Sequence, residues 1–155
     1  MKFVAKEDIE APIDEVFARI TDFHAFERSA IRRGAEVKRL DNPPLTGPGA
    51  GWEVRFDLRG KRRIIGLEVT DFDGPERMQL KLRSEGLKGH VLVDLVALSR
   101  ARTRLRVETE LKPKTLSARL LIQSLRLARG TIEKRLAERM AEFAASLERS
   151  PKSPG

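Results

Sequence analysis

A regular apolar pattern runs through the C-terminal part of this chain, over residues 115–148. Apolar residues recur there at intervals of three, four or seven, which places them on one face of an α-helix. They are Leu121, Leu125, Ala128, Ile132, Leu136, Phe143 and Leu147. At 1.5 Å per residue, such a helix is about 50 Å long. Its apolar face needs a large partner, and the rest of the 155-residue chain has to supply it.

Rows of alternating residues predict that the partner is a β-sheet. From Trp52 onward the apolar period changes to two, which is typical of half-buried strands. The rows are separated by turn residues, and the short connections predict an antiparallel meander. The inward-facing rows are Trp52, Val54, Phe56 and Leu58, then Ile65, Leu67 and Val69, then Met78, Leu80 and Leu82, then Val91, Val93, Leu95 and Ala97, and last Thr103, Leu105, Val107, Thr109 and Leu111.

The first 51 residues predict a strand, two short helices and a second strand. Residues 3–9 form the first strand. Pro12 is suited to the first turn of a helix, and Asp22 to the start of a second helix that ends at Gly34. Residues 36–41 form the second strand, and a run rich in Pro and Gly over residues 41–51 connects it to the meander.

Composition limits the classes of protein to which the chain can belong. There is no cysteine, which excludes disulfides and thiolate chemistry and fits a reducing compartment, so we expect a cytoplasmic location. No apolar run approaches the roughly 18 residues of a membrane span. We expect one domain over residues 1–149 and a disordered tail over residues 150–155.

The sequence contains no motif for catalysis, a metal or a cofactor. His24 and His90 lie far apart and lack the spacing of metal ligands. The glycine-rich run at residues 47–51 precedes a strand rather than a helix, so it reads as a turn and not as a phosphate-binding loop. We therefore expect no catalytic residue, no metal and no cofactor.

Two short motifs carry a resemblance to a known superfamily. The first is Ile9-Glu10-Ala11-Pro12-Ile13-Asp14-Glu15-Val16-Phe17, followed by Thr21-Asp22-Phe23; the second is Gly49-Ala50-Gly51-Trp52. Together with the element order, they resemble the SRPBCC superfamily. It includes START-type lipid-transfer domains, plant pathogenesis-related proteins of the birch-pollen type and polyketide cyclase/dehydrase-like proteins. Phe26-Glu27-Arg28 stands where many relatives carry a tryptophan.

The resemblance implies an α+β helix-grip fold, in which a long C-terminal helix packs across a curved antiparallel sheet. It also implies a cavity between sheet and helix that binds a hydrophobic small molecule or lipid, with an anionic group as an option. Arg129 and Arg139 can hold that group, or their stems can cover apolar surface while their tips reach water. The cavity candidates are Phe26, Trp52, Phe56, Leu67, Leu82, Val93, Leu105, Leu125, Arg129, Ile132 and Arg139.

Two other functions remain open from the sequence. The first is a polyketide cyclase/dehydratase-like enzyme, for which Glu7, Asp94 or His24 has to point into the cavity. The second is binding to an anionic membrane or to nucleic acid through the basic C-terminal third. We expect no nucleic-acid partner, because few aromatic residues are free to stack on bases.

The C-terminal third also carries most of the charge and a second apolar row. Residues 101–155 hold 13 Lys and Arg against 6 Asp and Glu, and residues 112–129 hold five cations and no acid. Leu116, Leu120 and Leu127 lie opposite the main helical stripe. Leu92, Val96 and Leu98 are likewise out of phase with the inward-facing row of their strand. These extra apolar faces predict a homodimer contact or a transient contact with a membrane.

Overall fold

The structure is a computed structural model that describes residues 1–149. Over these residues the chain forms seven strands and four helices, and the order of strands and early helices predicted from the sequence is confirmed. The elements are β1 (Lys2–Ile9), α1 (Ile13–Ile20), α2 (Phe23–Arg32), β2 (Glu36–Arg39), β3 (Gly51–Leu58), β4 (Lys61–Asp73), β5 (Arg77–Ser84), β6 (Leu87–Ser99), β7 (Arg102–Pro113), α3 (Leu116–Leu127) and α4 (Arg129–Glu148). The tail that we predicted to be disordered, residues 150–155, lies outside the described part.

All seven strands form one antiparallel sheet in the order β1-β7-β6-β5-β4-β3-β2. Strands β2 to β7 pair with their neighbours along the chain, and β1 joins the far edge beside β7. The β3–β4 turn needs only two residues, because Arg59 and Gly60 both adopt positive φ angles, 55° and 72°. Such a turn matches the natural twist of paired strands.

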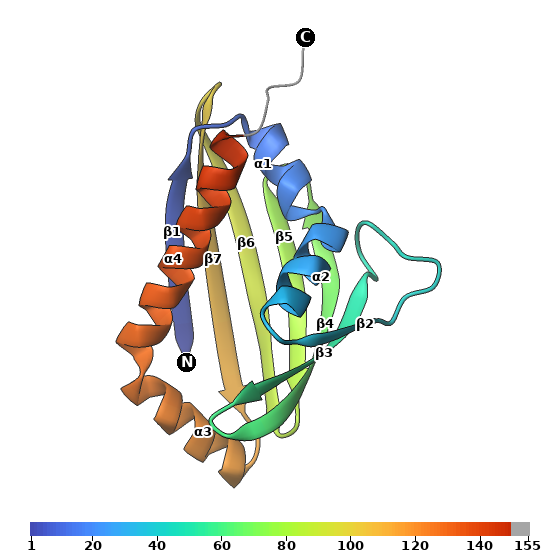
Figure 1. Cartoon of the computed structure of the whole chain (residues 1–155), viewed down its shortest axis with the longest axis vertical. Coiled ribbons are helices and arrows are strands. Elements are labelled where there is room, and N and C mark those ends of the chain that lie inside the picture. The colour runs from blue at the N-terminus through green and yellow to red at the C-terminus, as the bar shows by residue number, and fades with distance from the viewer. Residues whose placement is uncertain (150–155) are drawn as a thin grey trace.

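The strand register gathers the inward-facing rows on one face of the sheet. Trp52 lies opposite Leu67, and Leu67 lies opposite Leu82, so one apolar row crosses three strands. We call this the concave face; helices α1, α2 and α4 stand in front of it (Figure 1). The outer face carries the alternate residues, such as Glu68 opposite Lys81.

The two early helices begin where the sequence predicted. Pro12 immediately precedes α1, and the Asp22 side chain accepts a hydrogen bond from the backbone N–H of Ala25 at 3.2 Å, which caps α2. Gly34, with φ of +92°, follows α2 and turns the chain into β2. Their buried residues Val16 and Phe23 pack into the core of the concave face.

The C-terminal helical segment is divided, and the prediction of one helix over residues 115–148 was wrong in this respect. The helix breaks at Ala128, whose backbone leaves helical geometry with φ of −98° and ψ of 12°. The break lets α3 and α4 bury their apolar faces in different places. Ile122 and Leu125 of α3 pack under the end of the sheet, whereas Met140 of α4 packs on the main core.

Candidate ligand-binding face

The helices in front of the concave face leave its middle strands incompletely covered. Helix α4 packs most closely on β1, α2 on β2, and α1 on β6 and β7. Between these contacts, apolar side chains that point toward the helices are only partly buried. They are Ile65, Leu67, Leu80, Leu82 and Val91. The concave face therefore retains apolar surface that no other part of residues 1–149 covers completely.

The C-terminal helices contribute further apolar residues to the same space. Ile132, Leu136 and Phe143 of α4 pack against the core and remain partly buried, as does Leu121 of α3. Leu136 contacts both the main core and the smaller cluster at the end of the sheet. Partly buried apolar residues of α3 and α4 thus pack against the same core as those of the sheet.

The structure places the cavity candidates in three different environments. Phe56, Leu67, Leu82 and Ile132 are partly buried at the concave face. Four others are buried in the hydrophobic core: Trp52, Val93, Leu105 and Leu125. The remaining three, Phe26, Arg129 and Arg139, are exposed, and Arg139 pairs with Glu142 at 3.8 Å.

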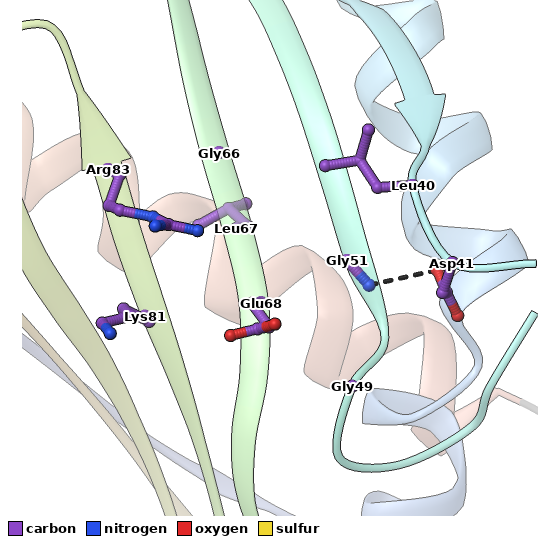
Figure 2. A pocket seen from close by; sticks show the side chains of 9 residues that line it. All are labelled: Leu40, Asp41, Gly49, Gly51, Gly66, Leu67, Glu68, Lys81 and Arg83. Atoms are coloured by element: carbon purple, nitrogen blue, oxygen red, sulfur yellow. Dashed lines mark hydrogen bonds between the residues drawn. The ribbon is translucent and has the colours of Figure 1, made fainter.

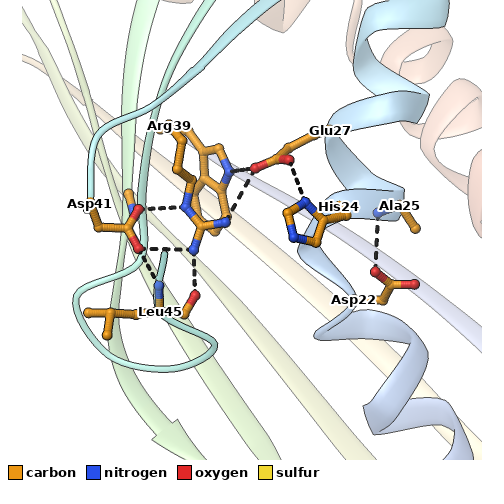
Figure 3. Close-up of polar contacts among 9 residues, drawn as sticks. Asp22, His24, Ala25, Glu27, Arg39, Asp41 and Leu45 are labelled. Carbon is orange, nitrogen blue, oxygen red and sulfur yellow. Dashed lines mark hydrogen bonds and ion pairs between the residues drawn. The ribbon is translucent and has the colours of Figure 1, made fainter. Parts of the chain in front are cut away.

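A polar cluster lies at the edge of the concave face, where it links α2 to β2 and β3 (Figure 3). Arg39 Nη2 donates to Asp41 Oδ2 at 3.0 Å, and Arg39 Nη1 donates to Glu27 Oε1 at 3.3 Å. The guanidinium carbon of Arg39 lies 4.7 Å from the centre of the Trp52 ring. Trp52 Nε1 in turn donates to Glu27 Oε1 at 2.9 Å. These contacts fasten α2 to the sheet and bury Trp52, which is only 1% exposed.

Asp41 acts in this cluster as a permanent anion. Hydrogen bonding to the Arg39 guanidinium lowers the pKa of Asp41 far below its usual range, although burial opposes the shift. The backbone N–H groups of Leu45 and Gly51 donate to the same carboxylate at 2.6 and 3.1 Å, which ties down the loop between β2 and β3. Because Asp41 stays ionised near neutral pH, it fits a structural role better than proton transfer.

This cluster was not predicted from the sequence. The available signal was the phase of β2, in which Arg39 shares the inward face with Val37 and therefore lies under α2. The hydrogen bond from Trp52 on the sheet to Glu27 on α2 joins residues far apart in the chain, so no local spacing predicts it.

Two clefts lie on the outer face of the sheet, and neither was predicted from the sequence. The one in Figure 2 has a volume of about 190 Å³ and opens above Gly51 and Gly66, which have no side chains to fill it. Glu68, Lys81 and Arg83 line its rim and form no ion pair within residues 1–149. The other lies over β2 and β3. Both face away from the helices, and Leu67 is the residue of the concave surface described above that also lines the first cleft.

Comparison with solved structures identifies the architecture. Zhui aromatase/cyclase from Streptomyces sp. R1128 superposes with a TM-score of 0.68 at 15% identity, covering 96% of this chain and 94% of that chain. Truncated norcoclaurine synthase from Thalictrum flavum gives 0.68 at 12% identity, with 98% and 95% covered. A START superfamily protein from Mycobacterium smegmatis gives 0.56 at 14% identity, with 90% and 98% covered. The chain has the helix-grip fold.

At these identities the likeness shows the fold alone. The helix-grip fold that the sequence predicted is thereby confirmed. No protein-family profile matches the sequence, and no curated protein matches it either. The chemistry of this helix-grip protein has to be argued from its own residues.

The three acid–base candidates, Glu7, Asp94 and His24, do not come together on the concave face. Glu7 shares the inward side of β1 with Ala5 and Ile9, is partly buried, and has no hydrogen-bond or ion-pair partner within residues 1–149. Asp94 lies on the outer face and accepts a hydrogen bond from Arg77 Nε at 3.1 Å. His24 is exposed on α2 beside Glu27. Of the three, only Glu7 lies on the concave face, on the strand against which α4 packs.

Within residues 1–149 no group of three or more His, Asp or Glu side chains is arranged to hold a metal ion. None of the helices over the same residues is both long enough and apolar enough to cross a membrane.

Proposed function

We propose that residues 1–149 form one domain that binds a hydrophobic small molecule or lipid at the concave face, between α4 on one side and α1 and α2 on the other. The observation that carries this proposal is the partial exposure of inward-facing apolar side chains on β4, β5 and β6. A ligand that covers them gains about 25 cal/mol for each Å² of apolar surface removed from water. A cytoplasmic location, expected from the lack of cysteine, stays a prediction.

An anionic group on the ligand has a suitable partner in Arg129. This residue begins α4, and its guanidinium lies 5.9 Å from the centre of the Phe3 ring, at the margin of the apolar surface. It forms no ion pair within residues 1–149. Arg139 is a weaker choice because Glu142 already partly neutralises it. We therefore propose that the ligand's apolar part lies over Leu67 and Leu82 and that its charged end meets Arg129.

Two residues of β4 provide a matched test. Leu67 points to the concave face, whereas Ile64 is exposed on the outer face of the same strand. Binding of the anionic fluorescent probe anilinonaphthalene sulfonate is to be titrated against the wild type, Leu67→Gln and Ile64→Gln. We expect about tenfold weaker binding for Leu67→Gln, from the loss of one partly buried leucine contact, and no change for Ile64→Gln. Equal affinities for the two variants refute the proposed site.

A second candidate, an enzyme of the cyclase or dehydratase type, is favoured by one residue. Glu7 is a carboxylate on the concave face without a hydrogen-bond or ion-pair partner in the described residues, so no other group competes for its oxygens as a general base. In this proposal the apolar face holds a reactive chain in a folded conformation, and Glu7 removes a proton from it. Glu7→Gln should then abolish turnover of a poly-β-keto substrate while leaving probe binding intact. Turnover that persists in Glu7→Gln rules this role out.

A further inference from the structure

Helix α3 has two apolar faces, and only one of them contacts the protein. Ala118, Ile122 and Leu125 are buried against the end of the sheet. On the opposite side, Leu116, Leu120 and Leu127 are 73%, 58% and 92% exposed. At 100° per residue these three leucines fall within about 40° of one another around the helix, so they form a continuous stripe. We refer to Leu116, Leu120 and Leu127 as the outer leucine stripe.

Cations without carboxylate partners flank the outer leucine stripe. Arg119 and Arg126 lie along one side of it, and neither forms an ion pair within residues 1–149. On the other side, Arg59 at the tip of the β3–β4 hairpin donates through Nη2 to the backbone carbonyl of Ser124 at 3.5 Å. Residues 112–129 contain no acid at all. Helices that lie in the interface of an anionic bilayer typically carry exposed leucines bordered by arginines.

The position of α3 leaves this surface accessible. It lies at one end of the sheet, beside the β3–β4 hairpin and far from the β6–β7 turn (Figure 1). Its N-terminus is fixed by Thr115, whose Oγ1 accepts a hydrogen bond from the N–H of Ala118 at 3.2 Å. The buried face is fixed by packing with Phe3, Leu87 and Leu111. The outer leucine stripe is therefore held rigidly on the surface and does not have to fold when it meets a partner.

We infer that the outer leucine stripe of α3, with Arg119, Arg126 and Arg59, docks the protein on the surface of an anionic lipid bilayer. The leucines enter the acyl boundary, and the guanidinium groups meet lipid phosphates. A second copy of the chain is a poorer occupant, because an isologous contact would bring the same arginines together without any acid. Nucleic acid is poorer too, because it leaves the leucines exposed to water. The docking does not require a ligand at the concave face.

The test is flotation with phosphatidylcholine vesicles, with and without an equal part of phosphatidylglycerol. The wild type should float with the acidic vesicles only. Leu116→Ser/Leu120→Ser/Leu127→Ser should bind at least tenfold more weakly, and Arg119→Gln/Arg126→Gln about thirtyfold more weakly, since two cations leave the membrane surface. Val96→Ser/Leu98→Ser removes exposed apolar residues at the far end of the molecule and should bind like the wild type.

Each contrary outcome overturns the inference and points elsewhere. All changed side chains are exposed, so the melting temperatures should match that of the wild type, and a variant that has lost its fold is recognised by its circular dichroism. Flotation of the leucine variant equal to the wild type refutes the docking surface. A wild-type dimer that the leucine variant converts to monomer assigns the stripe to a second copy. Tight DNA or RNA binding that needs the arginines but not the leucines assigns it to nucleic acid. Probe binding at the concave face is measured separately, so the two proposals can fail independently.

Discussion

Replacing Arg39 by methionine is expected to destabilise the protein much more than the same replacement of Arg104. Each arginine makes a two-point contact with an aspartate; Arg104 reaches Asp8 at 2.8 and 3.2 Å. The pairs differ in their surroundings. The side chains of Arg39 and Asp41 are 15% and 8% exposed, whereas those of Arg104 and Asp8 are 49% and 29% exposed. Arg104→Met is therefore a control with the same chemistry at the surface.

The size of the effect follows from what Arg39→Met leaves behind. The carboxylates of Asp41 and Glu27 lose their shared cation, and the loop N–H groups alone cannot compensate for it. Removing one partner of a largely buried ion pair costs about 3 kcal/mol, and methionine retains only the apolar contact of the arginine stem with Trp52. For a protein of this size, we expect the melting temperature to fall by about 6–12 °C. The exposed Arg104→Met variant should change little.

Urea unfolding followed by far-UV circular dichroism measures this difference. Fluorescence is unsuitable, because the only tryptophan of the chain, Trp52, lies against the side chain being changed. The wild type and both variants are to be compared at neutral pH and equal ionic strength. If Arg104→Met loses as much stability as Arg39→Met, or if Arg39→Met loses none, the polar cluster does not fasten α2 to the sheet as we describe.

Two further predictions concern the turn before α3 and the acid stability of the cluster. Gly86 has φ of +68°, and a Cβ there would lie 2.2 Å from Thr115 Oγ1. Gly86→Ala should therefore lower the unfolding free energy by about 2 kcal/mol, from backbone strain and the loss of the α3 cap. The control is Gly34→Ala, which has φ of +92° but no atom within 4 Å of the new Cβ, and it should lower the unfolding free energy by about 1 kcal/mol. Equal losses in urea unfolding would contradict the clash. Because the pKa of Asp41 is lowered on folding, its ionisation stabilises the protein above the unfolded pKa of about 3.9, and this contribution disappears as pH falls through the folded pKa. The stability difference between wild type and Asp41→Asn should therefore shrink below about pH 4, and a difference independent of pH would refute this reasoning.

The strands and helix ends that were predicted from the sequence are those whose structure depends on a few neighbouring residues. Alternation of apolar and polar residues is enough to place a strand, and Asp22 or Gly34 marks a helix end through its own backbone and side-chain chemistry. The break at Ala128 was missed for the opposite reason. The apolar period continues through it, and alanine favours helix, so the break is imposed by two separate packing sites at the sheet.

The candidate site was predicted only in part, because it depends on how much covers each residue. The pattern assigned Leu67 and Trp52 equally to the concave face, and both are there. It could not show that α2 buries Trp52 while Leu67 stays partly exposed. The Arg39–Glu27 contact links residues on α2 and β2, and no local spacing predicts it.

Photocrosslinking tests the proposed ligand site most directly. A long-chain fatty acid with a diazirine on its chain is to be irradiated with the full-length protein, and the labelled peptides are to be identified by mass spectrometry. We predict labels around Leu67 and Leu82 on the sheet and Ile132 on α4, which excess unlabelled fatty acid suppresses. Labels confined to the outer leucine stripe or to the outer face, or labels that competition does not reduce, would contradict binding at the concave face.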